Sequence, residues 1–449
     1  MAKGSIIRRA RRAVARMLAP EISTRGYDAA SWKRFPREAT MGRTSLETIQ
    51  AAPLVRRKAR YFAVNSAPAS AAINALVTYL WGFGAVPAHD DEELVKEFLK
   101  WWDVCDADGR TNFGGLIAQA IRACIVDGEV FVIFRQRGDG LKLQLMPAEQ
   151  VDESLTRDVG GGVQIVAGVE LDAQGQRVAY WVRPFLPSQQ FETYAPPVRV
   201  DAADVLHLMR PEGIGQIRGV SWLAPIMLKL ADLGLLSDAL LKGFQVAAMH
   251  AGFLTDANGA TQLPFEGQKD GDALDVSLEP GIVRRLPSGM DIKFSNPQAA
   301  QQSIEFLTAC IEEIAAGLQV PAFMVSGNVS RANYSSLRAA LIVFKASLEA
   351  TQFNIILPQL LAPIWRRWAI TRGGTVNDAA EDAEWRFPAL PEADPAKALA
   401  AVKIALDAKL MSRKEAIAAR GESIERVDAD IADDPHALPT EALPKESQP

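Results

Sequence analysis

Cysteine and histidine are scarce in this chain of 449 residues, which has three of the first and four of the second. Cys105, Cys124 and Cys310 lie far apart and lack the spacing of a metal site, so we expect buried thiols in a reducing compartment. His207 stands in a stretch with the composition of a strand, and we expect a packed structural residue and not a base. The sequence therefore predicts no metal and no cofactor.

Motifs of catalysis are missing as well. The chain contains no GxSxG, no HExxH, no Walker A phosphate loop and no CxxC. Gly160-Gly161-Gly162 is not followed by Lys-Ser or Lys-Thr, so it indicates a loop and not a phosphate site. The acids that follow His89 stand where a helix begins, and the helix dipole favours them there. These absences predict that the protein is not an enzyme.

A long apolar run and an excess of positive charge are two further absences. No uninterrupted apolar stretch reaches the roughly 18 residues of a membrane span, so we expect no transmembrane helix and no membrane partner. The net charge of −5 excludes the overall basic character of a tight DNA binder. Any nucleic acid would have to be held locally or enclosed. Residues 1–20 are basic but lack the apolar core of a secretory signal, and a solvated arm suits them better than a transit peptide.

The rest of the composition is typical of a globular protein with more than one domain. Hydrophobic residues make up 48% of the chain and charged residues 23%, and its length exceeds what one core accommodates. Helical spacing over residues 46–83, a β-branched and aromatic run at Val130–Phe134 and alternating stretches up to Val205 predict an α+β first half. We expect the whole chain to be α+β and mainly helical.

Four basic residues cluster on the first predicted helix, namely Arg56, Arg57, Lys58 and Arg60. We favour the interpretation that they form the solvated face of an amphipathic helix. Contact with nucleic-acid phosphate is the alternative.

The second half of the chain alternates helices with connections. One helix is expected from Ser221, which can cap it, to about Met249. Residues 252–296 form a polar excursion in which Gly, Asp and Pro recur, and a second helix with one apolar seam follows over 297–317. Two helices joined by such an excursion are expected to form one antiparallel pair.

The connection at 318–333 separates the second helix from a third, which runs to about Ile370 and should kink at Pro358 and Pro363. Small and polar residues predominate in this connection, and none of the surrounding residues supplies catalytic chemistry. The pattern indicates a moving or threading part. The residues that we expect to carry this role are Met324, Val325, Ser326, Gly327, Asn328, Val329, Ser330 and Arg331.

Several stretches of the chain resemble phage portal proteins of the lambda-like family. The matching stretches are Leu54–Asn65 with its Arg57-Lys58-Ala59-Arg60 run, Asp127–Phe131, His207-Leu208, Gly215–Pro225, Val320-Pro321 and Asn333–Ala339. The Gly-Gln-x-Arg-Gly-Val-Ser and Asn-Tyr-Ser-Ser blocks are specific when they occur in this order, and either alone would be weak. The resemblance covers about residues 46–410.

The resemblance implies a ring-shaped channel at one vertex of a phage capsid, in the virion, assembled in the host cytoplasm. The implied partners are further copies of the chain in a dodecamer, double-stranded DNA in the channel, the terminase large subunit, the head–tail connector, the major capsid protein and the scaffold. A nucleic-acid enzyme, such as a nuclease or packaging-motor component, is one alternative, and a non-phage structural adaptor is another. An enzyme of that kind would need clustered carboxylates or a phosphate loop, and we find neither.

The resemblance also implies a division of the chain into the parts of a portal. The implied parts are a basic arm at 1–45, an α+β wing at 46–220, a first stem helix at 221–251, a clip at 252–296, a second stem helix at 297–317, a channel loop at 318–333, a long kinked wing helix at 334–370, and a crown region with an acidic tail at 371–449.

Charges in the implied stem and loop have two interpretations. One interpretation is that Glu305, Glu312 or Glu313 faces the channel lumen, and the other is that these residues pair with Lys or Arg of the next subunit. Arg331 is expected to touch phosphate transiently, and capping of the third helix or simple solvation are the alternatives. Each Lys or Arg contact would add affinity for DNA through counterion release, so a channel that lets DNA slide should have few of them.

Overall fold

The computed structural model describes most of the chain between residues 42 and 434. The described residues are 42, 44–89, 91–138, 140–185, 195–248, 253–254, 284–285, 298–330, 334–372, 383–388, 395–418, 420 and 424–434. The basic N-terminal segment at 1–45 and the predicted clip therefore lie almost entirely outside the described residues, as do Arg331 and the end of the acidic tail.

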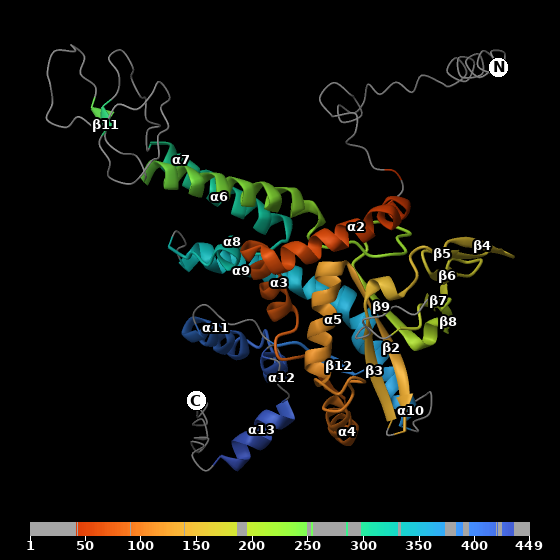
Figure 1. Ribbon diagram of the computed structural model, residues 1–449. Coiled ribbons are helices and arrows are strands. Elements are labelled where there is room, and N and C mark those ends of the chain that lie inside the picture. The colour runs from red at the N-terminus through yellow and green to blue at the C-terminus, as the bar shows by residue number, and fades with distance from the viewer. Residues whose placement is uncertain are drawn as a thin grey trace, which may run out of the picture.

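Helices and a small sheet form the body of the molecule (Figure 1). Four helices come first in the chain: α2 (Thr44–Asn65), α3 (Ala67–Leu80), α4 (Glu92–Trp102) and α5 (Phe113–Asp127). The predicted helix start after His89 is confirmed, because the Asp91 side chain accepts hydrogen bonds from the Glu93 and Leu94 amides. All three cysteines are buried and free, as predicted.

Two antiparallel sheets follow the helices and confirm the α+β first half. The first has the order β3-β2-β9, in which β2 (Glu129–Arg137) is the central strand between β3 (Gly140–Met146) and β9 (Val205–Met209). The second is a five-stranded meander of β4 (Arg157–Gly160), β5 (Val163–Val166), β6 (Val169–Leu171), β7 (Arg177–Val182) and β8 (Val198–Asp201). Alternate residues of β2 face two different apolar clusters, Val130 and Val132 on one side and Phe131 on the other, so β2 lies between two apolar layers.

A long helix crosses the body and supplies much of its core. It consists of α9 (Tyr334–Thr351), a π-helical segment η5 (Gln352–Leu361) and α10 (Ala362–Thr371). The wider π-helical turns surround Pro358, where the missing amide removes a normal helical bond. Trp365 and Trp368 of α10 each lie 5.1 Å from the Phe98 ring, centroid to centroid. The β1 (Val86–Ala88) and β12 (Glu384–Arg386) pair closes this aromatic core.

This long helix is also notable for its exposed apolar surface. Among the described residues, Ser335–Thr371 is the one helix that is long and apolar enough to cross a membrane by length and composition, and only 22% of its most apolar window is buried. Charged residues such as Arg338, Lys345 and Glu349 interrupt the apolar sequence, so no uninterrupted run is present. The helix is continuous through Pro358 and Pro363, and a π-helical segment surrounds the first of these two prolines.

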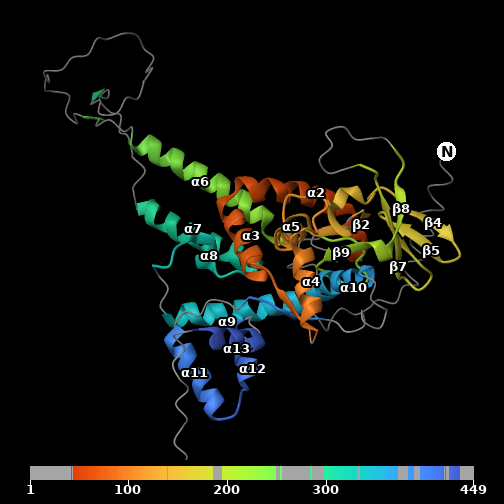
Figure 2. The same cartoon turned by 90° about the horizontal axis from the view of Figure 1, so that it is seen from below.

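Two helices, α6 (Met227–Ala248) and α7 (Gln298–Gly317), project from the body as an arm (Figures 1 and 2). They are antiparallel, because Lys229 near the start of α6 pairs with Glu313 near the end of α7. The short helix η4 (Ala224–Ile226) precedes α6, and the Ser221 hydroxyl accepts a hydrogen bond from the Leu223 amide. Ser221 therefore opens this turn and does not cap α6 directly. Of the excursion, only β10 (Phe253–Leu254) and β11 (Arg284–Arg285), which pair in parallel, are described.

The C-terminal region forms three helices below α9 in Figure 2. They are α11 (Pro395–Asp407), α12 (Arg413–Ala418) and α13 (Ile424–Asp433). Arg413 forms an ion pair with Asp428, and this contact ties α12 to α13.

Candidate functional site

A buried ion cluster lies where the arm leaves the body. It consists of Arg56 from α2, Glu129 from the start of β2, Glu153, His207 from β9 and Arg218. Arg218 belongs to the connection between β9 and η4, directly before the arm. The cluster therefore joins the root of the arm to three elements of the body.

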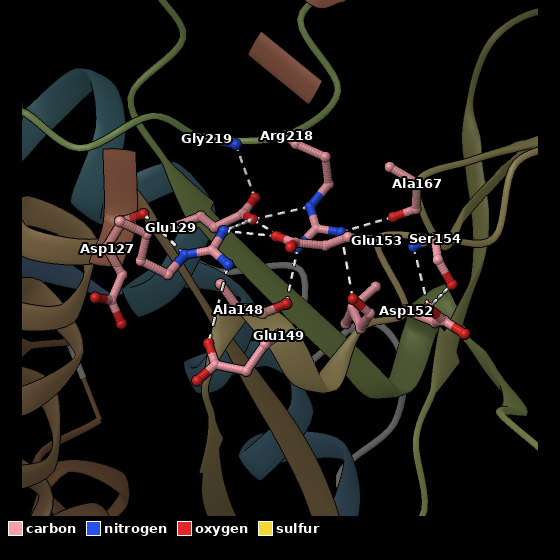
Figure 3. Close-up of polar contacts among 12 residues, drawn as sticks. Asp127, Glu129, Ala148, Glu149, Asp152, Glu153, Ser154, Ala167, Arg218 and Gly219 are labelled. Carbon is pink, nitrogen blue, oxygen red and sulfur yellow. Dashed lines mark hydrogen bonds and ion pairs between the residues drawn. The ribbon is translucent and has the colours of Figure 1, made fainter. Parts of the chain in front are cut away.

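Arg218 uses all three of its guanidinium nitrogens inside the protein (Figure 3). Its Nε donates to Glu129 Oε1 at 2.8 Å, Nη1 donates to the Ala167 carbonyl at 2.6 Å, and Nη2 donates to the Ala148 carbonyl at 2.8 Å. A further contact at 3.2 Å joins Nη2 to Glu153. The side chain is only 1% exposed, so its rigid planar fork fixes the relative positions of these four groups.

Glu129 is the anion that compensates this buried positive charge. Its side chain is fully buried and accepts hydrogen bonds from Arg218, from the Gly219 amide at 2.8 Å and from Arg56 at 3.3 Å. His207 Nε2 lies 2.9 Å from its second oxygen. Burial alone would raise the pKa of Glu129, but the charge of Arg218 and the hydrogen bond with His207 outweigh burial and hold that pKa well below its usual range. Burial lowers the pKa of His207, so its imidazole is neutral near pH 7.

Two glycines allow the cluster to form. A Cβ atom added at Gly219 would lie 2.2 Å from the Gly128 carbonyl oxygen, closer than any side chain can approach a backbone. Gly128 has a φ of 92° and would itself place a Cβ 2.2 Å from Val220. The Asp127-Gly128-Glu129 and Gly215–Ser221 motifs, which are separate in the sequence, therefore meet with their backbones in contact.

The basic patch on α2 has a different role from either predicted one. Arg56 is 3% exposed and contacts Glu153 at 2.7 Å in addition to Glu129. Arg60 makes two hydrogen bonds to Asp127, at 2.6 and 2.7 Å. Both the solvated face and the phosphate contact are therefore wrong for these two arginines, because buried or partly buried carboxylates of the body hold them. Arg57 and Lys58 are exposed, as a solvated face requires.

The predicted loop at 318–333 is only partly a loop. Residues Ala322–Ser326 form a short helix, α8, which ends at Gly327 with a φ of 68°. Within the segment predicted as a loop, Met324 and Val325 are packed residues of a helix, because Val325 is buried and Met324 packs against the main core. Their apolar side chains have partners in the body that a local reading of the sequence does not show.

The exposed part of this segment is Ser326–Ser330, which we call the loop tip. Its polar groups bond locally: Asn328 Oδ1 accepts from the Ser330 amide at 2.9 Å and from the Ser330 hydroxyl at 2.6 Å. The Ser326 hydroxyl accepts from the Asn328 amide at 3.1 Å. Val329 is 56% exposed. The loop tip thus presents small uncharged groups to solvent.

The three predicted glutamates of α7 differ from one another. Glu313 pairs with Lys229 of α6 at 2.9 Å, so its partner lies within the chain and it braces the arm. Glu305 and Glu312 are exposed on α7. Their positions are compatible with both predicted roles.

The motifs gathered at the cluster match one family. A family model described as phage portal protein, lambda family, matches residues 26–352. The chain belongs to the lambda family of phage portal proteins. The match includes both glycine motifs, the arm, the loop tip and α9, and it ends within η5. Membership in the portal family confirms the resemblance noted from the sequence.

Similar proteins include a probable portal protein of Halomonas phage phiHAP-1, which is 26% identical over 303 residues. That match covers 64% of this portal chain and spans 58% of the relative's length. Among solved structures, the neck of a native gene transfer agent particle with C12 symmetry has a TM-score of 0.45 at 15% identity, covering 82% of this chain and 92% of that one. An HK97 family phage portal protein from Corynebacterium diphtheriae has a TM-score of 0.35 at 14% identity, covering 76% and 96%.

The sequence missed the buried ion cluster although it contained the signal. In the sequence, Arg218 and Glu129 are members of two separate motifs, and neither motif indicates a role for its charge. Each is a charged residue beside a glycine, and such a glycine often marks close backbone packing. That pattern indicates that the two motifs pack tightly, but it does not indicate that they pack against each other.

Proposed function

We propose that this chain assembles head to tail as a ring, a dodecamer at one vertex of the capsid in the virion, whose channel passes double-stranded DNA during packaging and ejection. In this proposal the body is the wing and the arm is the stem. Membership in the portal family supports the proposal, and one property of the arm carries the assembly step.

That property is the exposure of α6. The helix is apolar around much of its circumference, yet Leu228, Leu235 and Leu241 are 81%, 70% and 57% exposed. After Leu233, none of the α6 side chains that the structure describes is buried. A helix that is apolar on most sides is normally covered. Neighbouring copies of the arm would provide that cover.

Two glycines of α6 agree with this assembly. Gly234 and Gly243 cost helix stability, and close packing of neighbouring helices would compensate for that cost. In the single chain a Cβ at either position would meet only open space. The close neighbours would then come from adjacent copies. Contact between two different faces of one chain generates a closed ring when the rotation closes.

The loop tip is the proposed constriction around DNA. Ser326–Ser330 contains no lysine or arginine, and its polar groups are already bonded to one another. Each phosphate contact by a cation would strengthen binding. An uncharged tip therefore lets the duplex slide, in agreement with the net charge of −5. Arg331, outside the described residues, is proposed to touch phosphate transiently.

The proposed partners follow the parts of the ring. The clip at 252–296 would dock the terminase large subunit and later the head–tail connector, and the wing would contact the major capsid protein and scaffold. Both assignments rest on the family, since the clip lies almost entirely outside the described residues. The chain would act in this assembly without catalysing a reaction, and the ring would be assembled in the host cytoplasm.

Electron microscopy of the purified protein in negative stain tests the ring directly. We expect particles of about twelve subunits with a central hole, and native mass spectrometry should give the matching mass. Leu235→Asp places a charge on the exposed apolar face of α6, and we expect folded single chains with unchanged circular dichroism. Arg110→Glu, at an exposed site of the body, is the matched control and should still form rings. Wild-type protein that stays monomeric at every concentration would refute the proposal.

Shortening the loop tip tests the constriction. Deletion of Asn328–Ser330 leaves α8 and the buried Val325 in place. We expect intact rings that package or retain DNA poorly. If this variant forms no rings, the segment is an assembly element and its assignment to the channel is wrong.

A further inference from the structure

The outer face of α9 is an uncharged stripe along the helix. Its members are exposed and recur at helical spacing: Ser335, Ala339, Ile342, Val343, Ala346 and Ala350 on α9, followed by Phe353 at the start of η5. Ile342, Val343 and Phe353 are 60%, 72% and 50% exposed. The stripe extends for about 27 Å at 1.5 Å per residue. Water covers this surface in the single chain, which is unfavourable for so long an apolar face.

Positive charges lie along one edge of the stripe. Arg338 and Lys345 are both exposed and are seven residues apart, so they project from the same side of α9, two turns from each other. Lys345 Nζ also lies 3.8 Å from Glu349 Oε1, but both side chains are exposed to solvent, so this ion pair contributes little energy. The stripe therefore offers large apolar side chains beside two cations about 10 Å apart.

The outer face of α7 has the complementary properties. Glu305, Ala309, Glu312 and Ala316 are exposed and recur at spacings of four, three and four. The two glutamates are seven residues apart, as the two cations of α9 are. The alanines beside them leave space where large side chains can enter. Small residues on one helix and large ones on the other permit close packing.

We propose that α9 of one copy docks on α7 of the adjacent copy, with Ile342 and Val343 over Ala309, and Arg338 and Lys345 paired with Glu305 and Glu312. The contact joins two different faces of the chain, so it is head to tail and suits a ring. The inference rests on the proposed ring and adds one of its interfaces. It also assigns Glu305 and Glu312 to the subunit contact and not to the channel lumen.

The occupant follows from the match of three properties. A second copy matches all three properties, because every copy has both faces. The large side chains of α9 meet Ala309 of α7, the two cations meet the two glutamates, and both charge pairs are seven residues apart. A lipid surface would cover the apolar stripe but would leave the two glutamates of α7 without a use. DNA would be repelled by those glutamates and gains nothing from the stripe. Electrostatic complementarity of this kind selects the partner and fixes its register.

Two paired charge reversals test the contact. The first variant carries Glu305→Lys and Glu312→Lys, and the second carries Arg338→Glu and Lys345→Glu. Each variant alone places like charges opposite each other at every interface, and we expect the concentration for half-maximal ring formation to rise at least about tenfold. A mixture of the two variants restores opposite charges at every interface of an alternating ring. We therefore expect rings with an even number of subunits, containing both variants equally.

The outcomes separate this inference from the proposed function. Rings formed normally by the first variant alone would overturn the inference and return Glu305 and Glu312 to the lumen, while the ring itself would stand. Failure of the mixture, with both variants folded by circular dichroism, would also overturn it. Binding of the wild-type chain to phospholipid vesicles that Ile342→Asp abolishes, with rings unaffected, would assign the stripe to a lipid surface. Wild-type chains that never form rings would refute the proposed function before the variants are compared.

Discussion

Replacement of Arg218 by methionine tests whether the buried ion cluster holds the arm to the body. Methionine keeps much of the length and apolar stem of arginine but removes the guanidinium and its five donors. Glu129 would remain fully buried with Arg56 at 3.3 Å and His207 at 2.9 Å as its remaining side-chain partners. The carbonyls of Ala148 and Ala167 would lose the donors that now lie 2.8 and 2.6 Å away.

The expected loss is large for one substitution. Breaking a buried ion pair by removing one partner costs about 3–5 kcal/mol. Each of the two carbonyls left without a donor adds on the order of 1 kcal/mol to the loss of stability unless water replaces the donor. Arg56 remains as a cation beside Glu129 and offsets about as much as the two carbonyls add, so we expect a total loss of roughly 3–5 kcal/mol. For a cooperative unit of about 150–250 residues, that loss corresponds to a fall in Tm of roughly 6–20 °C.

Differential scanning calorimetry at fixed protein concentration measures this fall, and hydrogen exchange locates it. We expect faster exchange of the amides from Gly219 to Leu223, which anchor the arm, as well as in β2. Arg218→Lys should give a smaller loss, since a single ammonium cannot reach all of the acceptors. Lys96→Met removes an exposed ion pair with Glu93 and serves as the control, with no expected change in Tm.

A second variant removes the uncompensated charge. In Glu129→Gln combined with Arg218→Met, neither member of the pair is ionised, so we expect part of the lost stability to return. A fall of less than about 2 °C in Arg218→Met would refute the reasoning, because the cluster would then contribute too little to hold the arm. Equal falls for Arg218→Met and the double variant would show that packing and not charge is decisive.

Three further substitutions test the ion cluster and α6. The pKa of His207 in the folded protein lies below its value in the unfolded chain, so below about pH 6.5 the unfolded state binds more protons and the free energy of unfolding falls with the pH. His207→Gln should therefore flatten the fall in Tm between about pH 6.5 and 5. An unchanged slope would contradict the assignment. Gly219→Ala should prevent soluble expression, because its Cβ would lie 2.2 Å from the Gly128 carbonyl oxygen. Gly234→Ala lies in open space on α6 and should raise the free energy of unfolding of the unassembled chain by about 1 kcal/mol, as measured by thermal unfolding. Soluble Gly219→Ala protein with a normal Tm would show that the two backbones separate at little cost.

Local features of the fold were accessible from the sequence because they depend on neighbouring residues. Periodicity predicted the helices of the body and arm, and Asp91 before Glu92 and Glu93 predicted the start of α4. Turn residues and β-branched runs predicted the strands of the first half. The order of the motifs identified the portal family, which the family match over residues 26–352 confirms.

Features that depend on distant residues were inaccessible. Arg56 and Arg60 had the pattern of a solvated helix face, and only the approach of Asp127 and Glu129, about seventy positions away, makes them buried partners. Met324 and Val325 had the composition of a loop, and only the core beside α8 makes them packed residues. Burial depends on what lies opposite a residue, which local composition does not specify.

The sequence by itself therefore determined most of the helices and strands and the family, and it contained the two glycine motifs, since each of these features depends on residues that are close together in the chain. Only the tertiary structure decided that these motifs meet at Arg218 and Glu129, because opposite charges attract strongly only when folding removes both from water. The exposed faces of α6, α7 and α9 likewise became visible only when the fold showed that no part of the described chain covers them.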